Sequence, residues 1–410
     1  MRLGDRRLLL LARSLRLFAY GGLSVVLVFY LTARGLTTSQ IGLLLTLTLV
    51  GDTIVSLLLT TRADRMGRRR MLLVGAVLMA AAGLVFAISS NFLILLFTAT
   101  IGVISPSGNE VGPFFPIEQA ALAHVVAPTQ RTGVFAWYTL AGAFATAAGS
   151  LAVGALLHAL QVAGDTSPLE NYRVVVVGYA MVGALLAACF ARLSPAIEVI
   201  DARRASLLGV DRSRSIVWRL SGLFALDSFA GGFVVQSFAA YWFFLRFRVD
   251  PADLGLIFFG ANILAGLSAL LAARLATRFG LVNTMVFTHL PSNVLLILVP
   301  LMPTLPLAVL TLFARFSISQ MDVPTRQSYL MAVVPPQERA AAAGITGVAR
   351  TTGAAVAPVF AGLLFSRAAL INFPFFVAGT LKIVYDLWLY RAFITVRPVE
   401  DPVAPQARQG

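Results

Sequence analysis

Long apolar stretches, each carrying few or no charges, recur from one end of this 410-residue sequence to the other. A helix needs about 20 consecutive apolar residues to cross the hydrocarbon core of a bilayer. We predict membrane spans at 8–32, 41–60, 71–90, 93–124, 134–160, 172–193, 216–245, 253–277, 282–301, 305–333, 339–366 and 370–393. Because backbone groups in lipid must be hydrogen-bonded within the span, the pattern predicts an all-α integral membrane protein of about twelve transmembrane helices.

Charge is scarce and lies mostly at the ends of these spans. Charged residues make up 12% of the chain, against about 25% in a soluble protein. The net charge of +14 is carried by arginine, with Lys382 as the only lysine. Arginine at loop ends orients a membrane protein, so we expect no nucleic acid as a partner. The even-numbered connections are the basic ones, which predicts a multi-pass protein of the inner or plasma membrane with both termini cytoplasmic.

The two halves of the sequence repeat each other. At an offset of 213 residues, four positions recur, with Gly42, Ala63, Arg65 and Gly67 matching Gly255, Ala276, Arg278 and Gly280. Further on the offset is 208, and Pro116, Gln119, Val126, Pro128 and Arg131 match Pro324, Gln327, Val334, Pro336 and Arg339. The shrinking offset predicts about five extra residues in the first half, within 105–111. We therefore predict a six-helix bundle at 1–193, a cytoplasmic linker at 194–215, a second bundle at 216–395 and a cytoplasmic tail at 396–410.

The segment Thr60-Thr-Arg-Ala-Asp-Arg-Met-Gly-Arg-Arg69 resembles the signature that follows the second helix in the major facilitator superfamily of secondary transporters. Thr60 and Arg62 depart from the pattern, in place of a glycine and an apolar residue. The resemblance implies two pseudo-symmetric six-helix bundles, alternating access and a monomer. It also implies a conformational latch at the signature, formed by Asp64, Arg65, Gly67 and Arg68. Gly67 suits a tight turn, and the arginines suit anionic lipid headgroups.

Charges within the spans are candidates for a substrate or coupling-ion site, because a charge at mid-membrane usually faces a cavity or a partner. The resemblance places the first, fourth, seventh and tenth spans around the central cavity. The candidates are Asp52, Glu110, Glu118, Gln119, Asp227, Arg315, Asp322, Arg326, Gln327 and Arg350. Arg16 and Arg350 could bind the substrate or pair with buried acids.

Glu118 and Arg326 occupy equivalent positions in the repeat but carry opposite charges. We hypothesise that they meet when the cytoplasmic side closes and separate when a proton or the substrate neutralises Glu118. A static pair, or separate partners within each half, would explain the same residues. Asp322 and Arg326 are four residues apart, so they share a helix face and could pair with each other.

Two aspartates are predicted to lie deep in the membrane. Asp227 comes 11 residues after the start of its span, a depth of ~16 Å, and Asp52 lies 12 residues before Asp64, a depth of ~18 Å. Because burial disfavours the charged form of a carboxyl group, either could carry a proton.

Two groups near span ends are not expected to form a site. The histidines lack metal-ligand spacing, so no metal site and no cofactor are predicted at His124, His158 and His289. The aromatic run at 241–244 ends the seventh span, which predicts a place in the membrane–water interface.

A nucleotide-binding signature is absent from the sequence, so transport must use an ion gradient or the gradient of the solute. Apolar cavity candidates and isolated acids favour proton-coupled efflux of amphipathic or toxic small molecules. Uptake of a small organic anion is the alternative, favoured by Arg16, Arg315, Arg326 and Arg350. A non-transporting membrane partner is a remote alternative, and nothing resembles an enzyme's catalytic constellation. The expected partners are a small-molecule substrate, protons and membrane lipids.

Overall fold

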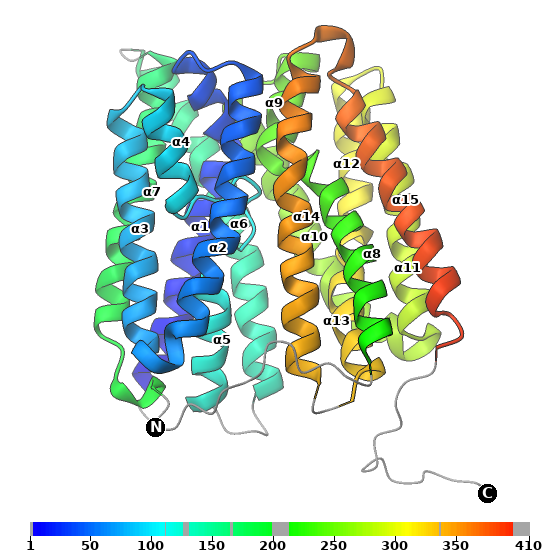
Figure 1. Cartoon of the computed structure of the whole chain (residues 1–410). Helices are drawn as coiled ribbons and strands as arrows, with labels where there is room; N and C mark the ends of the chain where they lie inside the picture. The colour runs from blue at the N-terminus through cyan, green and yellow to red at the C-terminus, as the bar shows by residue number, and fades with distance from the viewer. Residues whose placement is uncertain are drawn as a thin grey trace, which may run out of the picture.

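The computed structural model describes residues 3–110, 112–125, 131–164, 167–198, 213–335 and 338–396. The described residues are nearly all helical (Figure 1). The helices of the first half are α1 (Leu3–Ala33), α2 (Thr38–Met66), α3 (Arg68–Ile88), α4 (Phe92–Ile101), α5 (Phe114–Val125), α6 (Arg131–Ala163) and α7 (Pro168–Ala191), followed by the short η2 (Pro195–Ile197). Those of the second half are α8 (Arg214–Gly232), α9 (Gln236–Phe247), α10 (Pro251–Phe279), α11 (Leu281–Leu298), η3 (Val299–Leu301), α12 (Leu305–Ser319), α13 (Asp322–Val333), α14 (Arg339–Phe365), η4 (Ala368–Leu370) and α15 (Phe373–Phe393).

Ten segments of the described chain are helices long and apolar enough to cross a membrane. They correspond to ten of the twelve predicted spans. The other two predicted spans, 93–124 and 305–333, are not continuous helices, because each divides into two shorter ones, α4 with α5 and α12 with α13. The seventh span also bends, at residues 233–235 between α8 and α9.

The two divided spans differ in the length of their interruption. In the first half, residues 102–113 separate the helices, and Gly108 and Gly112 adopt φ angles of +70° and +82°. Such angles are open to glycine but strained for other residues. In the second half only Gln320 and Met321 intervene. The extra residues predicted at 105–111 therefore fall within the longer, irregular segment.

Helix boundaries confirm the internal repeat. Adding 213 to the bounds of α2 gives those of α10, and adding 208 to those of α5 gives those of α13. Gly67 and Gly280, which end α2 and α10, have positive φ angles of 100° and 85°. The tight turn after the second helix is thus built in the same way in both halves.

Equivalent helices pack together in the two halves. In the first, α1 packs on α6 and α7, and α3 on α7; in the second, α8 packs on α14 and α15, and α11 on α15. Glycines bring backbones together, since a Cβ at Gly21 would lie 2.1 Å from the Thr146 carbonyl oxygen. A Cβ at Gly353 would lie 2.3 Å from the Ala225 carbonyl oxygen. Close approach of this kind replaces the hydrophobic effect as the basis of helix association in lipid.

The two halves touch through α2 with α14, α6 with α10, and α1 with α9. Gly154 of α6 packs on Gly255 of α10, and Gly42 of α2 packs on Gly362 of α14. Gly42 and Gly255 follow the starts of α2 and α10, and Gly154 and Gly362 precede the ends of α6 and α14. Figure 1 shows these helix ends on the side of the molecule away from the chain termini.

Polar contacts between the halves lie in the same region. Gln236 donates from Nε2 to Ser24 Oγ at 2.9 Å, and Ser237 donates from Oγ to the Pro106 carbonyl at 2.6 Å. Within the part of the chain that the structure describes, hydrogen bonds between the halves all lie between mid-depth and the far end. The structure is therefore a conformation in which the halves are joined on the side away from the termini.

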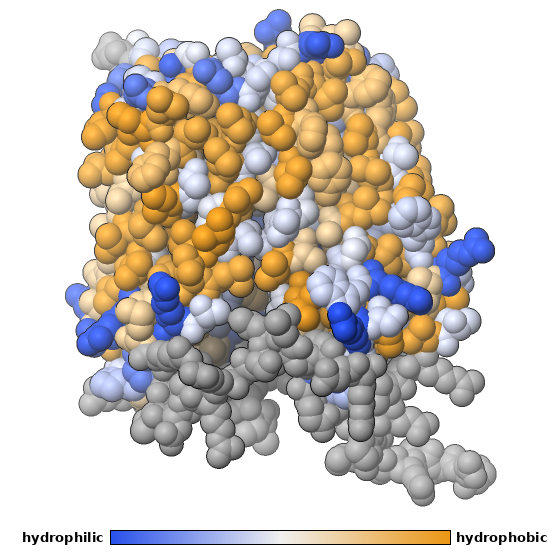
Figure 2. All heavy atoms as spheres, viewed as in Figure 1, coloured by the Kyte–Doolittle hydropathy of each residue, from blue (hydrophilic) through white to orange (hydrophobic). Residues whose placement is uncertain are grey.

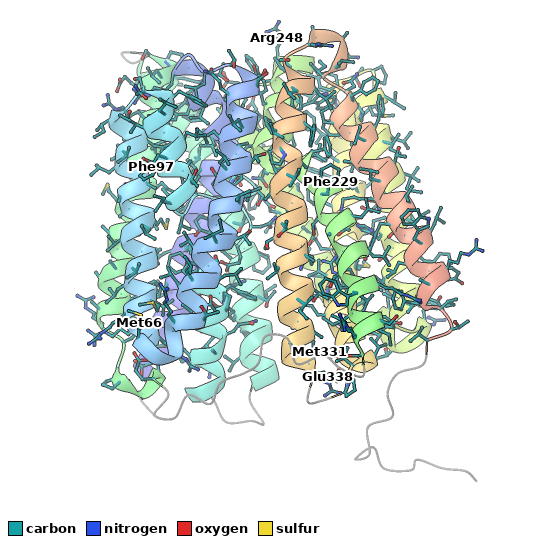
Figure 3. All side chains as sticks on the ribbon, viewed as in Figure 1. Met66, Phe97, Phe229, Arg248, Met331 and Glu338 are labelled. Carbon is teal, nitrogen blue, oxygen red and sulfur yellow. The ribbon has the colours of Figure 1, made fainter. Side chains whose placement is uncertain are left out.

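The outer surface suits a bilayer. Figure 2 shows a broad hydrophobic band between two more polar ends. Arg248 marks one end, and Met66 and Glu338 mark the end at which α1 begins and α15 finishes (Figure 3).

The prediction that the aromatic run at 241–244 lies at the interface is wrong for its first three residues. Tyr241, Trp242 and Phe243 are buried, and the Trp242 indole N–H donates to Asn372 Oδ1 at 2.8 Å. Contacts with neighbouring rings, including Phe375 on α15, fill this corner of the second half.

Candidate functional site

The first half buries a cluster of charges where α1, α5 and α6 meet the irregular segment. Arg16 of α1 donates to Glu118 of α5 from both terminal nitrogens, at 2.7 and 2.9 Å. Arg16 also lies 3.2 Å from Glu110 in the irregular segment, and Arg13 lies 2.6 Å from the same carboxylate. The Tyr138 hydroxyl of α6 donates to Glu118.

This first cluster leaves little charge uncompensated. Arg16 and Glu118 are fully buried, and the Arg16 guanidinium stacks over the Phe114 ring at 4.6 Å. Arg13 lies over the Tyr138 ring at 4.1 Å. A bidentate, buried arginine–carboxylate pair is rigid and costly to break. In this conformation the cluster holds the divided fourth span against α1.

Asp52 of α2 stands apart from the first cluster. Its side chain is only 8% exposed. Its Oδ1 accepts a hydrogen bond from the Gly112 backbone N–H at 2.5 Å and a longer one from the Ser56 hydroxyl at 3.4 Å. None of the described arginines, lysines or histidines forms an ion pair with Asp52. Asp52 thus holds the irregular segment of the fourth span through one backbone hydrogen bond, without a balancing cation among the described residues.

The second half buries a larger cluster centred on Asp227 of α8. Lys382 of α15 donates to Asp227 Oδ1 at 2.5 Å, and Arg326 of α13 donates to Oδ2 at 3.0 Å. Asp322 accepts a second contact from Arg326 at 3.2 Å, which confirms the predicted pairing four residues apart. All four side chains are buried, and two cations contact the Asp227 carboxylate.

His289 extends the second cluster towards α15. Its Nδ1 lies 2.8 Å from Asp386 Oδ1, and its Nε2 lies 3.8 Å from Asp227 Oδ1. Asn293 donates to Asp386 Oδ2 at 2.8 Å. The expectation that His289 lies near a span end is wrong, since it lies near the middle of α11, buried among these carboxylates.

The ion pairs of the two halves are related by the repeat with their signs exchanged. In the first half the basic partner, Arg16, is on the first helix and the acidic one, Glu118, on the divided span. In the second half the acidic partner, Asp227, is on α8 and the basic one, Arg326, on α13. The hypothesised pairing of Glu118 with Arg326 is not formed here, where each residue has its own partner within its own half.

Two further candidates have no ionic partner among the described residues. Arg315 of α12 and Arg350 of α14 are partly buried, and the Nε atom of each lacks a hydrogen-bond partner. Each guanidinium is close enough to Asp227 and Asp322 for a Coulombic attraction, although it forms no ion pair with either carboxylate. Of the two glutamines, Gln119 is half-buried and Gln327 is exposed.

The signature after the second helix links the start of α3 to α5 and to residues 197–198 through hydrogen bonds. Arg68 is buried and donates to the carbonyls of Ala120 and Ile197, at 3.2 and 3.1 Å. The carboxylate of Glu198 accepts from the backbone N–H groups of Arg68 and Arg69, at 2.7 and 3.1 Å, and so caps the start of α3. Asp64 and Arg65 lie in the last turn of α2, and their side chains are outside the described part.

The second-half partners Lys382, His289 and Asp386 were not among the predicted site residues, and Glu198 was predicted to lie in the linker at 194–215. The histidine and Asp386 carry no motif. Lys382 did offer a signal, because a single lysine inside an apolar span of an arginine-rich chain is unusual. Intramembrane charges of this kind are functional candidates by default.

Two repeated bundles of membrane-spanning helices, each with buried ion pairs, form the architecture of a multi-pass membrane transporter. The family model of the Major Facilitator Superfamily matches residues 9–246 and 220–410. These matches cover almost the whole chain, and the protein therefore belongs to the Major Facilitator Superfamily.

The chain is similar to other membrane proteins over different lengths. It is 32% identical to the uncharacterized membrane protein YJR124C of Saccharomyces cerevisiae, over 96% of this chain and 94% of that protein. A shorter stretch is 30% identical to the quinolone resistance protein NorA of Staphylococcus aureus, over 27% of this chain and 28% of NorA. Among solved structures, a bacterial homolog of the human lysosomal transporter Spinster has a TM-score of 0.74 at 15% identity, covering 97% of this chain and 98% of that one.

Proposed function

We propose that this protein is a proton-coupled secondary transporter that exports amphipathic or toxic small molecules, and that Asp52 carries the coupling proton. The observation behind the proposal is that Asp52 is buried without a cation among the described residues. A carboxylate in that setting is destabilised in its charged form. Taking up a proton removes the cost of burying the charge.

The balance of buried charges supports this assignment. In the first half, Arg13 and Arg16 face Glu110 and Glu118, and Asp52 is the remaining candidate acid, which has no cation beside it among the described residues. In the second half, Asp227 is neutralised by Lys382 and Arg326 together, so a proton there would have to displace a cation. Among Asp52, Glu110, Glu118 and Asp227, Asp52 is therefore the carboxyl group whose protonation displaces no cation.

The position of Asp52 links it to the moving parts of the molecule. It lies on α2, the helix that packs on α14 of the other half. It also binds the backbone of Gly112, which lies in the interruption of the same divided fourth span that carries Glu110 and Glu118. A change in its charge would act on the interface between the halves and on the irregular segment at once. This is the requirement for coupling a proton to alternating access.

The direction of transport and the orientation are part of the proposal. Likeness to a quinolone resistance protein over about a quarter of the chain favours export. The basic even-numbered connections favour termini in the cytoplasm, which makes the far-end contact between the halves the extracellular closure. We propose that the protein works as a monomer in the inner or plasma membrane.

The proposal is tested by accumulation of a labelled panel of lipophilic cations, a quinolone, organic acids and sugars in cells with and without the protein. Lower accumulation of an amphipathic compound, restored by a protonophore, is the expected result. Asp52→Asn should abolish uphill export while keeping downhill exchange of the same compound. Ser56→Ala, which removes only the weaker hydrogen bond, is the matched control and should keep uphill export. Uphill export by Asp52→Asn at the wild-type rate would exclude Asp52 as the proton carrier.

A small organic anion is a second candidate substrate, with uptake as the direction. Arg315 and Arg350 support it, because each is a partly buried guanidinium without an ionic partner in the described chain. Higher accumulation of an organic acid in the same panel, lost in Arg315→Gln and Arg350→Gln, would favour this candidate. An unchanged accumulation of every organic acid would remove it.

A further inference from the structure

A hollow on the outer surface of the second half lies between α8 and α15, near the end that carries the chain termini. Its volume is about 420 Å3, and it is lined by Trp218, Arg219, Gly222, Leu223, Trp388, Arg391 and Ala392. That volume falls within the range of about 300–1,000 Å3 that small-molecule sites occupy. The hollow is on the lipid-facing side of the bundle and is separate from the buried charge clusters.

The walls of the hollow are two exposed tryptophans on neighbouring helices. Trp218 of α8 is 58% exposed and Trp388 of α15 is 59% exposed. Neither indole N–H donates to another described residue. Isolated tryptophans at this depth would be ordinary interfacial residues. Here they flank a cavity whose floor is left open by Gly222, where an added Cβ would meet nothing within 4 Å.

Two arginines stand at the rim of the same hollow. Arg219 is one residue beyond Trp218, and Arg391 lies in the last turn of α15. Both are exposed, and neither forms an ion pair with a described residue. Figure 2 shows pale and blue side chains interrupting the hydrophobic band over the lower parts of α8 and α15.

We infer that this hollow binds one anionic phospholipid, with an acyl chain between Trp218 and Trp388 over Gly222 and the phosphate between Arg219 and Arg391. The apolar lining suits the chain, and the two cations suit a negative headgroup at the membrane surface. Free indole N–H groups can donate to the glycerol ester or the phosphate. This inference does not depend on the proposed substrate, on the coupling ion or on Asp52.

The test is quenching of tryptophan fluorescence by brominated lipids, using the full-length protein in phosphatidylcholine nanodiscs. Trp137→Phe removes the exposed tryptophan of the first half and serves as the background, because Trp242 is buried. Brominated phosphatidylglycerol, added at about 10 mol%, should quench the tryptophan fluorescence more than the same dose of brominated phosphatidylcholine. The reason is that the two arginines favour an anionic headgroup at the site.

Variants of the rim and the floor separate a site from general surface attraction. Each of Arg219→Gln and Arg391→Gln should weaken the phosphatidylglycerol preference about fivefold. Gly222→Leu should remove quenching by either lipid at this position, because the side chain fills the hollow without touching the core. Arg278→Gln, an exposed arginine at the end of α10, is the matched control and should leave the preference unchanged.

Equal quenching by the two brominated lipids in the background protein would overturn the inference. An undiminished preference for phosphatidylglycerol in both single variants, Arg219→Gln and Arg391→Gln, would also overturn the inference. Inorganic phosphate in the buffer should not displace the lipid, since it lacks the acyl chain. Loss of the preference in phosphate would mean a site for free anions and would also contradict the assignment. Transport is not measured at any stage, so this result and that on Asp52 are independent.

Discussion

Buried charges in this protein differ mainly in whether a partner is within reach. Asp227 accepts contacts from Lys382 and Arg326, whereas Asp52 accepts hydrogen bonds from a backbone amide and a hydroxyl. A paired carboxylate holds helices together and resists protonation. A carboxylate without a cation is free to change its charge, and this contrast is why we assign structure to the first and coupling to the second.

The pairing around Asp227 leads to a prediction for stability. Lys382→Met should lower the free energy of unfolding by about 3 kcal/mol, because it leaves Asp227 buried with part of its charge uncompensated. The measurement is thermal unfolding of the purified protein in detergent, with Lys382→Arg as the control that keeps the charge. Asp227→Asn with Lys382→Met should lose less than the sum of the two single variants. Additive losses, or an unchanged melting temperature in Lys382→Met, would contradict the pairing.

The buried charged residues of the candidate site were easier to predict from the sequence than the partners that they contact. The spacing of Asp322 and Arg326 gave their contact directly, because four residues make about one helical turn. The contacts of Asp227 with Lys382 and of Arg16 with Glu118 join residues 155 and 102 positions apart. Nothing in a single sequence fixes which faces of two distant helices meet, so those partners required the structure.

At the scale of whole helices, the close contacts between the halves depend on glycine. Gly154 of α6 lies against α10, and a Cβ there would come within 2.5 Å of the Ala252 carbonyl oxygen and 3.0 Å of Gly255 Cα. Both neighbours are backbone atoms, which cannot move aside as a flexible side chain would. The far-end closure therefore requires a residue without a side chain at this position.

Gly154→Leu should block the conformation seen here and reduce transport at least about tenfold, which corresponds to roughly 1.4 kcal/mol against closure. The initial rate of export of whichever panel compound is transported provides the measurement, normalised to the amount of protein in the membrane. Gly178→Leu on α7 is the matched control, since a Cβ at that position meets nothing within 4 Å. Wild-type rates in Gly154→Leu would show that the α6–α10 contact is not part of the transport cycle.

Helix positions were largely predictable, and helix interruptions only in part. The apolar stretches predicted each span, and the repeat offsets of 213 and 208 reappear in the helix bounds. The breaks at 102–113 and 320–321 could be anticipated only where glycine and proline gather. The first break does contain them, and the second is followed by Pro324, which has no N–H to donate to the carbonyl of Gln320 four residues earlier.

The whole molecule is two pseudo-symmetric halves joined at one end, which is the arrangement that alternating access requires. Contacts between the halves run from mid-depth to the far end through α2 with α14 and α6 with α10. In a rocking motion these contacts open as new ones form at the end that carries the termini. If Asp52 carries the coupling proton, its charge sets the balance between the two conformations.

The most direct test of this account is a pair of distance distributions measured by spin labelling across a range of pH. Cys189→Ala removes the single native cysteine. One label pair, Thr61→Cys with Ala343→Cys, reports on α2 and α14 at the end that carries the termini, and Ser39→Cys with Ser366→Cys reports on the far end. We expect the two distances to change in opposite directions as the pH changes, and Asp52→Asn to hold both populations fixed. Distances that shift in the same direction, or a pH response that Asp52→Asn retains in full, would contradict it.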